Sequence, residues 1–204
     1  PLVKDILEQR ELDLDVDPLS IYRNVIKEEE SRTGKQSRFA YDISRSQALE
    51  NDKVMKIFVK RLKDLCDATE KFLNSIISSL NKLPFGLRYI ASQMKKDLET
   101  RFPGDEEKVL KIVGNLIYYR YMNPAVVAPD GFNVIESMIS PTQRKNLAEI
   151  SKMLQQISVH KLFEDEFFYL SALNDYITKA KTKFFKFFSD CCVVQSPEDY
   201  FQID

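Results

Sequence analysis

The stretch that decides the fold is "EEKVLKIVGNLIYYRYMNPAVVAP", residues 106–129. Its apolar residues recur every three or four positions, which indicates a helix with a buried face. Few polar residues interrupt the run after Lys111, so we predict that this helix lies centrally in the molecule. The residue before a proline is disfavoured in the α-helical conformation, so Pro124 predicts that the helix ends near Asn123.

Helical signals recur on both sides of this stretch. Asp17 before Pro18 predicts an N-cap followed by proline in the first turn, and Gly34 predicts the end of that helix. Ser140 before Pro141 predicts a second start of the same kind. We find no convincing strand and no internal repeat, so the sequence predicts one all-α domain over residues 1–204. The expected helices cover residues 1–9, 18–33, 44–83 (as one helix or two), 84–102, 106–122, 141–158 and 170–190, with an exposed loop at 34–44.

Composition excludes several classes of protein. The 30 basic and 31 acidic residues nearly cancel, which argues against a surface built for nucleic acid or for anionic lipid. No apolar run reaches the length of a membrane span, so no direct membrane insertion is expected. Three cysteines, two of them adjacent, and a single histidine do not suit a zinc site, and no metal is expected. Free thiols and the absence of a signal peptide predict a cytoplasmic protein. The chain begins at Pro1 without an initiator methionine, so we expect it to be a piece of a longer one.

The segment "KFFKFF", residues 183–188, allows two interpretations. Basic residues beside aromatic ones are typical of helices that lie on membranes. The apolar residues from Tyr176 to Phe188 also follow helical spacing, and such a stripe in a bundle of this size favours a place in the core.

Arg120 is the unusual residue of the central stretch, since it stands among three tyrosines and a methionine. Burying a guanidinium group costs several kcal/mol unless its donors find partners. One interpretation is that Arg120 caps the carbonyl end of its helix and packs against tyrosine rings. The other is that it reaches across to hold another segment or a ligand.

Three blocks of the chain resemble Ras GTPase-activating domains. "LIYYRYMNPAVVAPDGFNVI" (116–135) resembles the family's signature: an aromatic, an apolar or aromatic residue, Arg, an aromatic, any residue, then Asn-Pro-Ala. "LPFGLRYIASQMKKDLETRFP" (83–103) and "QRKNLAEISKMLQQISVHKLF" (143–163) resemble the preceding and following blocks, in family order. "YYRYMNPA" with "VAPD", and "IYRNVIKEEESRTG" (21–34), are similar to the IQGAP-type branch. The resemblance covers essentially the whole chain.

This resemblance implies an all-helical domain whose shallow groove receives the switch regions of a GTP-bound small GTPase of Ras or Rho type. Such a domain is not an enzyme with chemistry of its own and needs no cofactor, because GTP and Mg²⁺ belong to the partner. Active members insert an arginine finger, which speeds hydrolysis about 10³- to 10⁵-fold. The family places that finger before the segment that matches residues 1–9. The chain would then be the larger, C-terminal part of a Ras-GAP domain, with the finger loop upstream of Pro1.

The resemblance also implies roles for four residues. Arg120 matches the arginine that holds the finger loop in place without entering the GTPase site. Asn123 and Pro124 match residues that shape the groove near the switch regions. Lys152 matches a lysine important for binding or for local integrity; from the residues alone, it is an ordinary exposed helix lysine.

Three further basic residues are candidates for contact with a GTPase. Arg88 could pair with a carboxylate across the groove, or it could hold the fold together. Arg144 and Lys145 could steer an acidic partner, or they could simply face solvent.

Three functional hypotheses follow. The chain is part of a GTPase activator, with a finger supplied upstream; or an IQGAP-type scaffold module that binds Rho-family GTPases without stimulating hydrolysis; or a helical structural domain without a GTPase partner. Recruitment to membrane or cytoskeleton would come through the partner or other domains.

Overall fold

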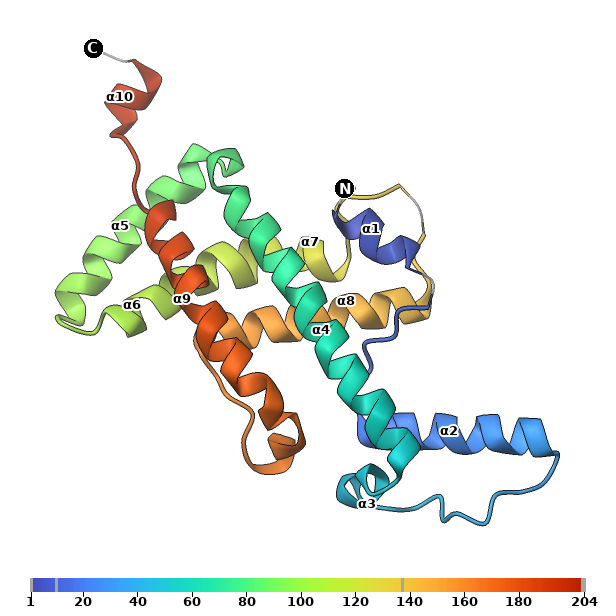
Figure 1. The fold of residues 1–204 in the computed structure, drawn as a ribbon. Helices are drawn as coiled ribbons and strands as arrows, with labels where there is room; N and C mark the ends of the chain where they lie inside the picture. Colours follow the sequence, from blue (N-terminus) through green and yellow to red (C-terminus); the bar gives the residue numbers. More distant parts are fainter. Residues whose placement is uncertain (1, 10, 137, 203–204) are drawn as a thin grey trace.

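The computed structural model describes residues 2–9, 11–136 and 138–202, and all regular structure in these ranges is helical (Figure 1). The all-α prediction is therefore confirmed. In chain order the elements are α1 (Leu2–Glu8), α2 (Pro18–Thr33), α3 (Arg45–Leu49), α4 (Asp52–Ser78), η1 (Leu80–Lys82), α5 (Phe85–Arg101), α6 (Glu106–Gly114), η2 (Asn115–Met122), α7 (Asn123–Val127), α8 (Pro141–Val159), η3 (Asp165–Leu173), α9 (Asn174–Cys191) and α10 (Pro197–Phe201).

The helix boundaries that rested on capping residues are confirmed. The Asp17 side chain accepts a hydrogen bond from the Leu19 N–H at the start of α2, and Gly34 ends that helix with a left-handed φ of 66°. Ser140 and Gln143 form a reciprocal capping box at the start of α8. These local bonds satisfy backbone groups that would otherwise be unpaired at helix ends.

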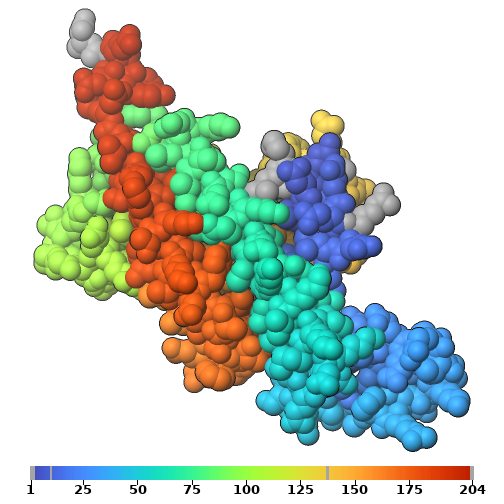
Figure 2. Space-filling view, in the orientation of Figure 1, coloured from blue at the N-terminus to red at the C-terminus, as the bar shows by residue number. Residues whose placement is uncertain are grey.

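Helices α4, α8 and α9 form the centre of the molecule. The long α4 crosses the bundle and packs against both α8 and α9 (Figure 1). In Figure 2 the surfaces of α4 and α9 lie side by side, while α2 projects to one end. Three phenylalanines of the "KFFKFF" segment, Phe184, Phe187 and Phe188, are at most 2% exposed, so that segment belongs to the core. No helix among the described residues is long and apolar enough to cross a membrane.

The segment between α1 and α2 is held against α8 by polar side chains. Asn146 of α8 accepts a hydrogen bond from the Leu14 N–H at 2.8 Å and donates one to the Leu12 carbonyl at 2.7 Å. Asp15, only 6% exposed, accepts hydrogen bonds from Lys145 and from Ser20. Burial alone would raise the pKa of Asp15, but these hydrogen bonds hold it below its usual value. Contacts between residues about 130 positions apart thus fix the entry into α2.

Candidate functional site

The central helix does not end at Asn123. It widens into a π-helix, η2, in which the Asn123 N–H bonds to the carbonyl of Tyr118, five residues earlier, and it continues directly into α7. Asn123 has α-helical angles, φ −57° and ψ −39°, so the expectation that Pro124 forces it out of that region is wrong. A π-turn holds an extra residue, which gives the proline ring room that a regular α-turn lacks. Arg120 consequently lies within a helical run rather than at its carbonyl end.

The inner face of η2 is locked to α8 by hydrogen bonds between side chains. The Tyr118 hydroxyl donates to Asn123 Oδ1 at 2.9 Å and also approaches the Ser151 carbonyl at 3.4 Å. Ser151 Oγ donates to the same Asn123 oxygen. Tyr118 is fully buried and meets Phe184 edge to face. The amide oxygen of Asn123 therefore points inward, towards Tyr118 and Ser151.

The outer face of η2 carries Tyr119, Arg120 and Tyr121, which we call the η2 surface. Both tyrosines are 47% exposed, and Arg120 is exposed as well. Its Nε donates to Asn115 Oδ1 at a long 3.4 Å. The cation–π contacts in the described part of the chain involve other cations. Arg120 is thus neither a C-cap nor packed over a tyrosine ring, and most of its donors face outward.

Lys152 lies on α8, directly after Ser151. It is exposed and forms an ion pair with Glu149 at 2.8 Å, one turn earlier. An exposed pair of this kind contributes little to stability, typically less than about 1 kcal/mol, so the Lys152 side chain is available to an incoming partner.

Arg88 is occupied within the fold. Its guanidinium group donates to the carbonyls of Cys191 at 3.1 Å, Val193 at 2.6 Å and Asp190 at 3.4 Å. These carbonyls lie at and beyond the end of α9, where a cation is favourable. Within the described ranges Arg88 thus has carbonyl partners and no carboxylate partner, which favours a role in holding the fold together.

Arg144 and Lys145 each form an ion pair within the chain. Both terminal nitrogens of Arg144 donate hydrogen bonds to the Asp130 carboxylate, and the shorter bond is 2.7 Å. Lys145 pairs with Asp15. Both lysine and arginine remain about half exposed, so they still contribute positive potential at the surface.

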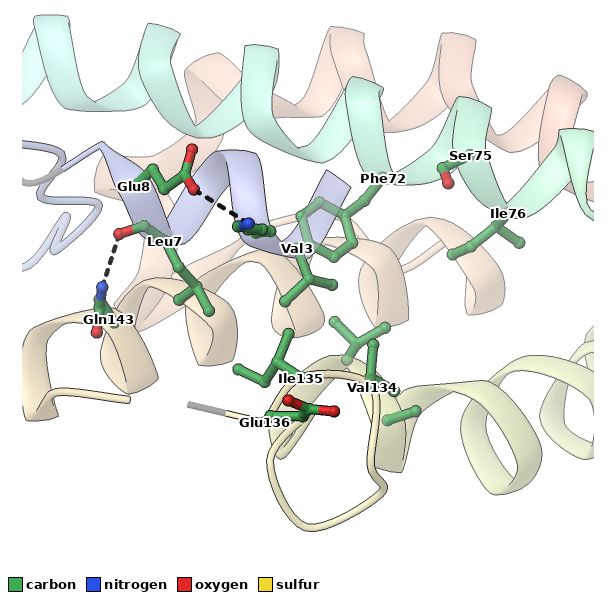
Figure 3. A pocket seen from close by; sticks show the side chains of 13 residues that line it. Val3, Leu7, Glu8, Phe72, Ser75, Ile76, Val134, Ile135, Glu136 and Gln143 are labelled. Carbon is green, nitrogen blue, oxygen red and sulfur yellow. Dashed lines mark hydrogen bonds and ion pairs between the residues drawn. The ribbon is translucent and has the colours of Figure 1, made fainter. Parts of the chain in front are cut away.

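The α1-facing side of α7 lines a pocket of about 740 Å³ between α1, α4 and the segment 134–136 (Figure 3). Val3, Phe72 and Ile135 are among its apolar walls. At its edge Gln143 Nε2 donates to the Leu7 carbonyl at 2.6 Å. The pocket separates α1 from α7 and is distinct from the η2 surface.

No group of three or more potential metal ligands gathers within the described ranges. The three cysteines are free. Burial raises the pKa of Cys66 to about 11 and that of Cys191 to about 12, so both thiols stay protonated at neutral pH and are poor nucleophiles.

Sequence reasoning found Arg120 and Asn123 but missed the two residues that position them. Ser151 is 28 positions away from Asn123 in the chain. Nothing in the sequence around a helical serine indicates which distant side chain it bonds to. Tyr118 reads as one tyrosine of three, and only the π-turn decides that its hydroxyl faces inward.

The comparisons with known proteins bear on the same residues. Residues 1–159 match the family described as "GTPase-activator protein for Ras-like GTPase". The chain is 43% identical to the mouse protein named Ras GTPase-activating-like protein IQGAP2, over 100% of the chain and 13% of that protein. It is 37% identical to human IQGAP3, again over 100% of the chain and 13% of the relative. A Dictyostelium discoideum protein, Ras GTPase-activating-like protein rgaA, is 35% identical over the whole chain and 25% of its own length. The chain spans about an eighth of the length of the two IQGAP relatives.

Proposed function

Because the chain belongs to the family of GTPase-activator proteins for Ras-like GTPases, we propose that it binds a GTP-loaded small GTPase through the η2 surface and the adjoining part of α8. The observation that supports this most strongly is the state of Arg120. A guanidinium group with one long hydrogen bond stands on a helical turn whose inner face is fixed by Tyr118, Asn123 and Ser151. An exposed, oriented cation on a rigid element is suited to positioning a neighbouring group.

In the proposed mechanism the domain stimulates hydrolysis when a finger arginine is supplied from outside residues 1–204. The planar fork of Arg120 donates to carbonyls of the finger loop, and the finger stabilises charge on the transferred phosphoryl group. Lys152 and Pro124 contribute to the surface that receives the switch regions. GTP and Mg²⁺ remain the partner's, and no cofactor is bound by the domain.

A second candidate is a module that binds Rho-family GTPases without accelerating hydrolysis. This candidate requires no finger arginine, which agrees with where the described part of the chain places its loop arginines. The arginines of the α2–α3 region do not gather near η2. Arg32 lies in the last turn of α2 and Arg38 in the loop after it, and Figure 1 shows α2 projecting away from α7. Arg45 is paired with Asp17. None of these three is placed to act as a finger at the η2 surface.

The deciding experiment uses the full-length protein and GTP-loaded Ras, with phosphate release as the readout. We expect saturating protein to accelerate release. Arg120→Ala should lower the rate about ten- to a hundredfold, because a misplaced finger loses transition-state stabilisation, while the Kd for the GTPase changes less than about twofold. The control Arg38→Ala, in the exposed α2–α3 loop, should leave both quantities unchanged.

The other outcomes separate the hypotheses. Binding of a GTP-loaded Rho-type GTPase with no acceleration at saturation rejects the activator and supports the scaffold module. An equal loss of binding and rate in Arg120→Ala contradicts the loop-support role. If Lys152→Ala leaves binding of every GTPase unchanged, its place in the contact surface is wrong.

A further inference from the structure

A second cavity, of about 340 Å³, lies between the Asp15–Asp17 segment, α4, α8 and residues 163–173. This volume is at the small end of ligand pockets, which run from about 300 to 1,000 Å³, and suits a single side chain. Its walls are mainly apolar, and one side is polar. The apolar lining is Val16, Leu65, Met153, Phe163, Phe167, Tyr169, Leu170 and Leu173.

The polar side of this cavity is a row on α8. Glu149, Lys152 and Gln156 follow at spacings of three and four, so they share one face of the helix. Gln156 Oε1 is buried and has no hydrogen-bond partner in the described part of the chain. A buried acceptor without a donor is unfavourable, and a turn of the Gln156 side chain into the cavity would let this oxygen accept from an incoming N–H group.

One guanidinium group of this chain already binds at the edge of the cavity. Arg45 Nε donates to Asp17 Oδ1 at 3.0 Å, and its guanidinium carbon lies 5.4 Å from the centre of the Tyr169 ring. Asp17 and Tyr169 both line the cavity. The combination of a carboxylate with an aromatic face is what an arginine prefers, and the fold uses it here once.

Around Phe167, which lines the cavity, the chain repeats that combination without a cation. Phe167 is 47% and Phe168 69% exposed. The three carboxylates just before them, Glu164, Asp165 and Glu166, are exposed and form no ion pair with a described residue. Exposed aromatic rings beside unpaired carboxylates are complementary to a basic segment of a polypeptide.

We propose that this cavity binds an arginine side chain from a basic segment of a partner polypeptide. The aliphatic stem lies against Phe167 and Leu170, the guanidinium group donates to Glu149 or Gln156, and residues 164–166 attract the neighbouring basic residues. Lysine fits less well, because its ammonium group lacks the planar face that stacks on aromatic rings. Lys152 competes for Glu149, and its exposed side chain must turn away when the arginine enters.

This site is separate from the proposed GTPase surface. Residues 163–173 form one wall, and they lie beyond the 1–159 range that matches the family. In Figure 1 they fold back at the far end of α9, away from α7. Lys152 is the one residue assigned to both sites, so a substitution there should affect the two kinds of binding differently.

The test measures binding of the capped peptide Gly-Gly-Arg-Gly-Gly to the chain by amide chemical-shift titration. We expect shifts confined to residues 149–156 and 163–173, weaker binding of the lysine peptide, and none with citrulline, which keeps the shape of arginine without its charge. Glu149→Gln should weaken the arginine peptide about fivefold or more. Its control is Glu99→Gln, which breaks an ion pair with Lys95 on α5, away from the cavity, and should change nothing.

Lys152→Met should change the affinity for the arginine peptide in the opposite direction from Glu149→Gln. It should tighten binding of the arginine peptide by removing the competing cation, while weakening the GTPase if that proposal holds. Tighter peptide binding with unchanged GTPase binding supports the arginine site alone. Equal binding of the citrulline peptide, equal effects of Glu149→Gln and Glu99→Gln, or shifts spread over the whole acidic surface overturn the arginine site, whatever the GTPase result.

Discussion

At the scale of single residues, the directions of three adjacent side chains determine which groups the η2 surface exposes. Tyr118 turns inward, while Tyr119 and Arg120 turn outward. The sequence predicted that Arg120 is special, because an arginine in an apolar run demands an explanation. It did not predict which tyrosine anchors the turn, because Tyr118, Tyr119 and Tyr121 are the same residue type and the partner Ser151 is distant in the chain.

Replacing Tyr118 by Phe should destabilise the fold by about 1 kcal/mol. The ring and its contact with Phe184 remain, but one of the two donors to Asn123 Oδ1 is lost. Burial raises the pKa of the Tyr118 hydroxyl well above its usual value, so it is a donor at any ordinary pH. Urea unfolding measures the change. Tyr119→Phe, which removes an outward-facing hydroxyl from the same turn, should stay within about 0.5 kcal/mol, and equal losses in the two variants would refute the anchoring role.

At the scale of elements, capping residues predicted where helices such as α2 and α8 begin or end. No residue pattern predicted the π-turn of η2. Asp17, Gly34 and Ser140 each act through bonds within a few residues, so their effect can be read locally. A π-turn and an α-turn use the same apolar residues and differ in which carbonyl accepts each N–H. That choice is made here by packing against α8 and α9, which lie far along the chain.

Gly114, the last residue of α6, should not tolerate even alanine. A Cβ atom there would clash with the Phe188 ring, and Phe188 is fully buried. Alanine favours a helix by about 1 kcal/mol over glycine, yet overpacking should make Gly114→Ala less stable by about 1–3 kcal/mol.

The matched control is Gly86→Ala in the first turn of α5, where a Cβ meets nothing within 4 Å. It should be neutral or stabilising by up to about 1 kcal/mol. Thermal or urea unfolding of the two variants measures the contrast. If both glycines respond alike, the close approach of α6 and α9 is not what selects glycine at 114.

At the scale of the whole molecule, the all-α class was predictable from periodicity. The hydrogen bonds that hold the α1–α2 segment against α8 could not be predicted from the sequence. "ELDLDVD" (residues 11–17) reads as an acidic alternation. Nothing local reveals that Asp15 is buried against Lys145, or that Asn146 forms hydrogen bonds with both Leu12 and Leu14. Local patterns specify helices, whereas pairings over 130 residues depend on how those helices pack.

Asp15→Asn should therefore destabilise the whole domain by about 1–3 kcal/mol at pH 7. The loss is smaller than for a fully buried pair, because Lys145 is half exposed and can be solvated. The folded-state pKa of Asp15 is lowered from 3.8, so its stabilisation is present above pH 3.8 and disappears as the pH falls through the folded value.

Urea unfolding at pH 7 and at successively lower pH measures this dependence. The difference between the wild type and Asp15→Asn should be largest near neutrality and shrink in acid. Asp97→Asn, at an exposed position of α5, should differ from the wild type by less than about 0.5 kcal/mol at every pH. A gap for Asp15→Asn that is constant with pH would mean that the carboxylate charge is not responsible.

The widened turn of η2 also limits how the length of this part of the chain can vary. A π-turn holds one residue more than an α-turn, so deleting one residue from 115–122 can restore a regular helix with little rotation of the residues beyond it. Such a deletion would remove the widened turn in which the Asn123 N–H bonds to the Tyr118 carbonyl. An inserted residue has no such compensation and would rotate everything beyond it by about 100° around the axis, whereas point substitutions keep this phase. The spacing between Gly114 and Asn123 is therefore as much a part of the site as the residues themselves.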